Sequence, residues 1–94
     1  MIGRKYDAGK PRWDLLPWLQ LGDVVKVLTH GAQKYGANNW RTVENGRDRY
    51  FAATLRHLVA WRNGERTDKE SRLPHLAHAA CNLLFLAWLD RGKR

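Results

Sequence analysis

The chain has little of several things on which small proteins often depend. It holds one cysteine, Cys81, so an internal disulfide is excluded, and the apolar neighbours of Cys81 favour a reduced, packed thiol. The longest apolar stretch, near residues 83–89, is flanked by Asn82 and Asp90 and is too short to span a membrane. No apolar segment follows the first residues, so a secretory signal is not expected either. These absences together predict a cytoplasmic protein.

Acidic residues are scarce, with nine Asp and Glu against 17 Lys and Arg, which gives a formal net charge of +8. Such an excess is typical of nucleic-acid binding, because basic side chains displace counterions from phosphates. The basic residues at the two ends are better explained as solvated tails: Arg4, Lys5, Lys10, Arg12, Arg91, Lys93 and Arg94. No nucleic-acid motif accompanies the arginines of residues 47–62, so a nucleic-acid-binding module ranks below the other hypotheses.

Helical periodicity dominates the sequence, and neither strand-like alternation nor an internal repeat occurs. Residues 18–36 predict a helix that Gly36 ends, with an apolar stripe of Leu21, Val24, Val25, Leu28 and Ala32. An Asn-rich loop is expected over residues 37–47. A second helix over residues 48–62 would end at Asn63-Gly64, with an apolar stripe of Phe51, Leu55, Leu58 and Val59. A third helix would begin near Pro74 and carry Leu76, Ala79, Leu83 and Leu86.

The predicted fold is therefore all-α, a small bundle of three helices that forms one domain over residues 1–94. Residues 4–17 hold Gly9, Pro11 and Pro17 among aromatic residues, which indicates an irregular arm lying across another surface. A chain of 94 residues with five Trp has more aromatic area than one thin core can bury. We therefore expect a homo-oligomer.

The spacing of His75, His78 and Asn82 at i, i+3 and i+7 predicts a polar stripe along the last helix. Glu65, Asp68 and Glu70 precede it closely in the chain and could join the histidines in a site of mixed oxygen and nitrogen ligands. Magnesium would prefer the carboxylates, whereas manganese or zinc would also accept imidazole. The spacing matches no standard zinc signature, so a satisfied core histidine and solvated acids are the alternative.

Two further segments carry side chains suited to a nucleotide. In the loop after the first helix, Lys34 could meet a phosphate, Tyr35 or Trp40 could stack on a base, and Asn38 or Asn39 could contact its edge. For Trp40 the alternative of a ring that plugs the core is favoured. On the second helix, Arg56 and His57 are adjacent, so at least one of them points away from the apolar stripe. The two residues are either functional or ordinary surface and packing residues.

These segments together resemble the dATP/dGTP diphosphohydrolase N-terminal-domain family of phages and bacteria. The resemblance rests on Gly31-Ala-Gln-Lys-Tyr-Gly36, Asn39-Trp40, Arg56-His57, Gly64-Glu65, Asp68, Glu70-Ser71, His75-Leu-Ala-His-Ala79 and Asn82. The start, Lys5-Tyr-Asp-Ala-Gly-Lys-Pro-Arg-Trp-Asp-Leu-Leu-Pro17, is similar as well. The match covers nearly the whole chain in order.

The resemblance implies an all-α, MazG-like nucleoside triphosphate pyrophosphohydrolase, oligomeric and dependent on Mg²⁺ or Mn²⁺, that modifies a phage nucleotide pool. The residues it carries over are Glu65, Asp68 and Glu70 with Arg56, His57, His75 and His78. Two departures stand out: the paired helical acids of better-known branches are absent, and Arg72 replaces the family's usual Gly.

The expected reaction converts a purine deoxynucleoside triphosphate, dGTP or dATP, into the monophosphate and pyrophosphate. An acid or His57 would orient the attacking water, while Arg56 and Lys34 would neutralise the leaving group. Because binding a phosphate needs fewer acids than cleaving it, a non-catalytic protein that sequesters a nucleotide is the main alternative.

Overall fold

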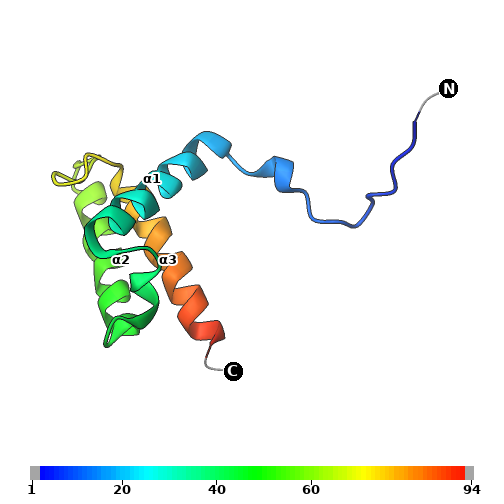
Figure 1. Cartoon of the computed structure of the whole chain (residues 1–94). Coiled ribbons are helices and arrows are strands. Elements are labelled where there is room, and N and C mark those ends of the chain that lie inside the picture. Colours follow the sequence, from blue (N-terminus) through cyan, green and yellow to red (C-terminus); the bar gives the residue numbers. More distant parts are fainter. Residues whose placement is uncertain (1–2, 93–94) are drawn as a thin grey trace.

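The computed structural model describes residues 3–92 and confirms the all-α prediction. Its helices are α1 (Trp18–Tyr35), α2 (Gly46–Arg62) and α3 (His75–Arg91), with short 3₁₀ turns η1 (Trp13–Leu15) and η2 (Asn39–Thr42). α2 and α3 pack along each other, and α1 lies across the pair and contacts α3 (Figure 1). Within residues 3–92 no helix combines the length and the hydropathy that a membrane span requires.

The ends of the helices follow the local signals in the sequence. Gly36 ends α1 with φ at +96°, and its backbone N–H donates to the Ala32 carbonyl at 2.8 Å. Gly64 adopts φ of +97° just after α2, and Pro74 directly precedes α3. α2 begins at Gly46, two residues before the predicted start, and η2 lies inside the segment expected to be a loop. The predicted helices are otherwise confirmed.

The apolar side chains that form the stripes of α2 and α3 are largely exposed in the structure. On α2, Phe51 and Val59 are 57% and 58% exposed, whereas the polar Thr54 is buried. On α3, Leu83 is exposed and His75 and Asn82 are buried. Several of the buried residues of both helices have small side chains: Gly46 and Thr54 on α2, and Ala77, Ala79 and Cys81 on α3. The bundle thus buries three polar side chains and leaves many large apolar ones exposed.

The core is correspondingly thin and is made where α1 meets α3. Val24 and Val27 of α1 are buried against Ala77 and Cys81 of α3. The buried face of α1 therefore differs from the predicted stripe, because Val27 is buried and Val25 is exposed. Partly buried residues complete this cluster: Leu73, Ala80 and Phe85.

The N-terminal arm extends away from the three helices (Figure 1). Its aromatic side chains are exposed, with Tyr6 at 82% and Trp13 at 70%. The arm was expected to lie across another surface, and within the described chain no such surface receives it. Its exposed rings and the apolar outer faces of α2 and α3 fit the expected oligomer, which stays a prediction, as does the single-domain extent.

Candidate functional site

A cavity of about 1180 Å³ lies between the C-terminal half of α1, the segment that follows it, and the inner faces of α2 and α3. Most of the residues that the sequence analysis singled out line it: Lys34, Tyr35, Asn39, Trp40, Arg56, His57, Asp68, Glu70, His78 and Asn82. Glu65 and His75 do not reach its wall. Segments far apart in the sequence therefore share one hollow.

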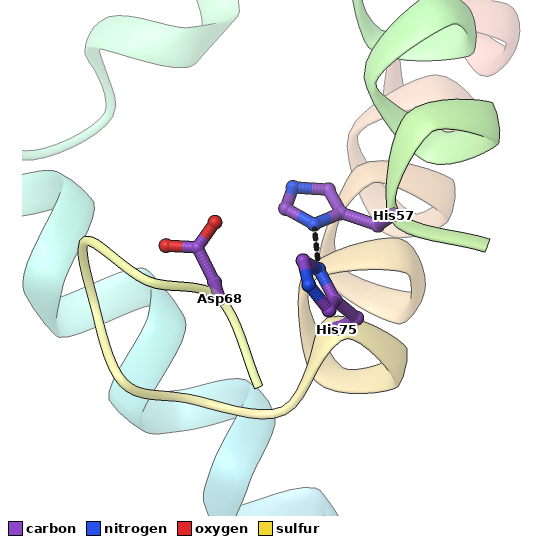
Figure 2. Close-up of side chains that lie close together, drawn as sticks. All are labelled: His57, Asp68 and His75. Carbon is purple, nitrogen blue, oxygen red and sulfur yellow. Dashed lines mark hydrogen bonds between the residues drawn. The ribbon is translucent and has the colours of Figure 1, made fainter. Parts of the chain in front are cut away.

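Three side chains converge beside this cavity: His57 and Asp68 line its wall, and His75 lies next to them outside the lining. His57 comes from the last turns of α2, His75 is the first residue of α3, and Asp68 lies in the loop between the helices. One ligand atom from each residue lies within 4.8 Å of the others, a grouping that suits a metal ion (Figure 2). The Nδ1 atoms of His57 and His75 are 2.8 Å apart, so one ring must donate a proton to the other when no ion separates them.

Backbone contacts within the loop hold Asp68 in place. Asp68 Oδ2 accepts hydrogen bonds from the backbone N–H groups of Glu70 at 3.1 Å and Ser71 at 2.9 Å. Burial acts to raise the pKa of Asp68, but the hydrogen bonds from Ser71 and Glu70 help to outweigh it and keep the pKa below its ordinary value. The carboxylate is therefore ionised at neutral pH and oriented by a rigid turn.

The same turn accounts for one departure from the family pattern. Arg72 has φ of +62°, the left-handed region that glycine adopts without steric cost. Its backbone N–H donates to the Asp68 carbonyl at 2.8 Å, which closes the turn. The Arg72 side chain is exposed and does not line the cavity. The arginine therefore strains the backbone and leaves the entrance to the site open.

His75 is almost completely enclosed, at 5% exposure. Its Nε2 atom has no hydrogen-bond partner, yet it lies 3.3 Å from Glu65 Oε1, within ion-pair range but without hydrogen-bond alignment. A buried N–H facing a carboxylate is a favourable arrangement, so the proton of His75 belongs on Nε2. Nδ1 is then left with a lone pair that faces His57. Glu65, expected as a metal ligand, is placed behind the ligand instead.

His57 and His78 form a stacked pair of rings, with centroids 4.5 Å apart and planes at 8°. Burial, followed by the proximity of His78 and His75, lowers the pKa of His57 to about 4. Burial also lowers the pKa of His78, whose Nε2 lies 2.7 Å from Ser71 Oγ. His57 is accordingly neutral at pH 7, the state in which an imidazole binds metal.

The remaining predicted groups are engaged in other contacts. Glu70 pairs with Lys34, which joins the end of α1 to the loop after α2 and raises the pKa of Lys34. Of the five residues expected to bind metal, the structure brings Asp68 and His75 together and adds His57, which had been assigned to catalysis. Glu65, Glu70 and His78 lie beside this triad, each with a different partner.

Trp40 packs among other aromatic rings. It stacks on Phe85, with centroids 4.3 Å apart, and meets the edge of Trp88 at 5.1 Å, while Arg41 lies 5.1 Å from the centre of its ring. This geometry corresponds to the core-plug alternative for Trp40. Tyr35, at 63% exposure, presents a freer ring to the same cavity. The contribution of either ring to binding stays a prediction.

Arg49 also lines the cavity, although the sequence pattern had placed it only among the arginines considered for nucleic-acid binding. Arg49 lies seven residues before Arg56, so both residues fall on the same face of α2. That spacing was visible in the sequence, but it acquires meaning only once the cavity is known to lie along this face.

Comparison with known proteins gives a consistent result. Residues 2–94 match the sequence profile of the family described as dATP/dGTP diphosphohydrolase, N-terminal. The chain is 37% identical over 89 residues to a dATP/dGTP diphosphohydrolase of Salmonella phage PMBT28. This similarity covers 95% of the chain but 30% of the phage protein. No solved structure matches the chain significantly. Because the profile covers nearly its full length, the chain belongs to the dATP/dGTP diphosphohydrolase N-terminal-domain family.

Proposed function

We propose that this domain binds a purine deoxynucleoside triphosphate in the cavity beside α2 and hydrolyses it to the monophosphate and pyrophosphate with a divalent metal ion. The observation that carries the proposal is the convergence of His57, Asp68 and His75, two of which line a cavity whose wall also holds the Lys34–Trp40 segment. The printed name of the phage relative, a dATP/dGTP diphosphohydrolase, supports the choice of substrate.

The donor set determines which ion fits. Two imidazoles and one carboxylate suit Mn²⁺ or Zn²⁺ better than Mg²⁺, which prefers oxygen ligands and bound water. The two Nδ1 atoms lie 2.8 Å apart and share a proton, so the rings would have to separate slightly for both to hold an ion through these nitrogens.

Each residue in and around the triad would have a separate role in the reaction. When bound, the ion would polarise a phosphoryl oxygen and lower the pKa of a water molecule. Asp68, held by backbone N–H groups, keeps its negative charge beside the histidines. Glu65 Oε1, 3.3 Å from His75 Nε2, would favour a proton on that nitrogen. Arg56 adjoins His57 on the cavity wall and would neutralise charge on the phosphates.

One observation favours the sequestering alternative. Among the acids expected to bind metal, Glu70 pairs with Lys34 and Glu65 faces His75, so Asp68 alone contributes a carboxylate to the triad. Phosphoryl transfer ordinarily uses several carboxylates to hold its ions. A cavity of this composition would bind a nucleotide even if the triad supported no turnover.

The experiment follows dGTP, dATP and other nucleotides incubated with the protein and Mg²⁺, Mn²⁺ or Zn²⁺, with products resolved by chromatography and binding measured in parallel. We expect metal-dependent monophosphate and pyrophosphate, with Mn²⁺ or Zn²⁺ more effective than Mg²⁺. Asp68→Asn should reduce turnover at least about 100-fold, whereas Asp23→Asn, on α1 and outside the triad, should not.

Each outcome has a distinct meaning. Tight binding with the nucleotide recovered intact would establish the sequestering alternative. Equal turnover in Asp68→Asn and wild type would remove the triad from the mechanism. If the protein shows no nucleotide binding and no turnover, the proposal is overturned.

A further inference from the structure

Two arginines line the cavity from the same face of α2. Arg49 and Arg56 are seven residues apart, about two turns, which separates their backbone positions by about 10.5 Å along the helix. Between them the cavity is lined by Tyr50 and by Ala52 and Ala53, none of which carries a charge at neutral pH. Arg56 is followed directly by His57 of the triad.

Neither arginine is neutralised by a neighbour. Within residues 3–92, acidic partners occupy Arg12, Lys34 and Arg47, but no acidic side chain forms an ion pair with Arg49 or Arg56. An arginine that projects five N–H donors into a hollow without a counter-charge is suited to an anion with several oxygens.

The acidic residues that line the cavity form no ion pair with either arginine. Glu70 is already paired with Lys34, and Asp68 is hydrogen-bonded within its loop beside the histidines. Asp48 lines the cavity next to Arg49 in the chain. The wall from Arg49 to Arg56 therefore carries two positive charges, and the lining residues between them, Tyr50, Ala52 and Ala53, are uncharged.

We propose that Arg49 and Arg56 form an extended polyphosphate subsite along α2, in which Arg56 holds the phosphate next to the triad and Arg49 holds the far end of the chain. This inference rests on the proposed function and adds a substrate preference to it. A ligand must be long enough to reach both guanidinium groups, so affinity should rise from phosphate to pyrophosphate to triphosphate. Arg49 then selects for chain length and does not touch the reacting bond.

The test measures binding of inorganic tripolyphosphate and pyrophosphate by calorimetry in EDTA, so that neither metal nor turnover contributes. We expect Arg49→Ala to weaken tripolyphosphate binding at least about 10-fold and to affect pyrophosphate less, while Arg49→Lys retains part of the affinity. Arg56→Ala should weaken both ligands. The matched control is Arg62→Ala, which removes the same charge from an exposed position of α2 outside the cavity and should change affinity less than about twofold.

Equal effects of Arg49→Ala and Arg62→Ala would overturn the inference, as would equal affinity of the wild type for the two ligands. Circular dichroism of each variant separates loss of binding from loss of fold. Because binding is measured without metal, failure of hydrolysis with an intact Arg49 effect would reject the proposed reaction and keep the subsite.

Discussion

Acid should destabilise this protein through His57 in particular. The His57 ring lies 2.8 Å, Nδ1 to Nδ1, from His75 and stacks on His78, so a proton on it is poorly solvated and meets two other imidazoles. These surroundings lower its pKa from 6.5 to about 4. Because the unfolded chain binds this proton more readily than the folded one, the stabilisation is complete above pH 6.5 and is lost as the pH falls towards 4.

The size of the effect follows from the two pKa values. Between pH 7 and pH 5, a shift from 6.5 to about 4 corresponds to a loss of about 1.8 kcal/mol in the free energy of unfolding. The ring is only partly buried, so solvent screening reduces the expected loss to about 1 kcal/mol.

Urea unfolding at pH 7 and pH 5, in EDTA to exclude metal, measures this loss. His57→Gln should lose about 1 kcal/mol less than the wild type between the two pH values. His30→Gln, a change outside the triad, should behave as the wild type. The reasoning fails if His57→Gln and the wild type lose the same stability.

Three further predictions concern other parts of the molecule. Arg72→Gly should raise the free energy of unfolding by about 0.5–1 kcal/mol, because it relieves a φ of +62°; an unchanged or lower urea midpoint would contradict the strain. Cys81 is 2% exposed and burial raises the pKa of its thiol to about 11, so a thiol reagent at pH 8 should label it only in denaturant; rapid labelling of the native protein would show that the core opens. The expected homo-oligomer should appear in sedimentation experiments, and Leu55→Glu with Leu83→Glu on the outer faces of α2 and α3 should give monomers; a monomeric wild type would refute it.

Local chemistry determined where the helices lie. Gly36 and Gly64 adopt positive φ values at the ends of α1 and α2, and Pro74 precedes α3, as their residue types predict. The grouping of histidines and acids between residues 57 and 78 likewise follows from chain proximity, since a short loop must bring the end of α2 back to the start of α3.

Only the tertiary structure decided which faces point inward and which acid joins the histidines. Periodicity identifies an apolar stripe on each helix but not its partner. In the structure Val24 and Val27 of α1 are buried with Ala77 of α3, whereas Phe51 and Leu83 are exposed. Glu65, Asp68 and Glu70 look equivalent in the chain. Backbone hydrogen bonds place Asp68 in the triad, while the positions of His75 and Lys34 engage the other two, a distinction set by three-dimensional contacts alone.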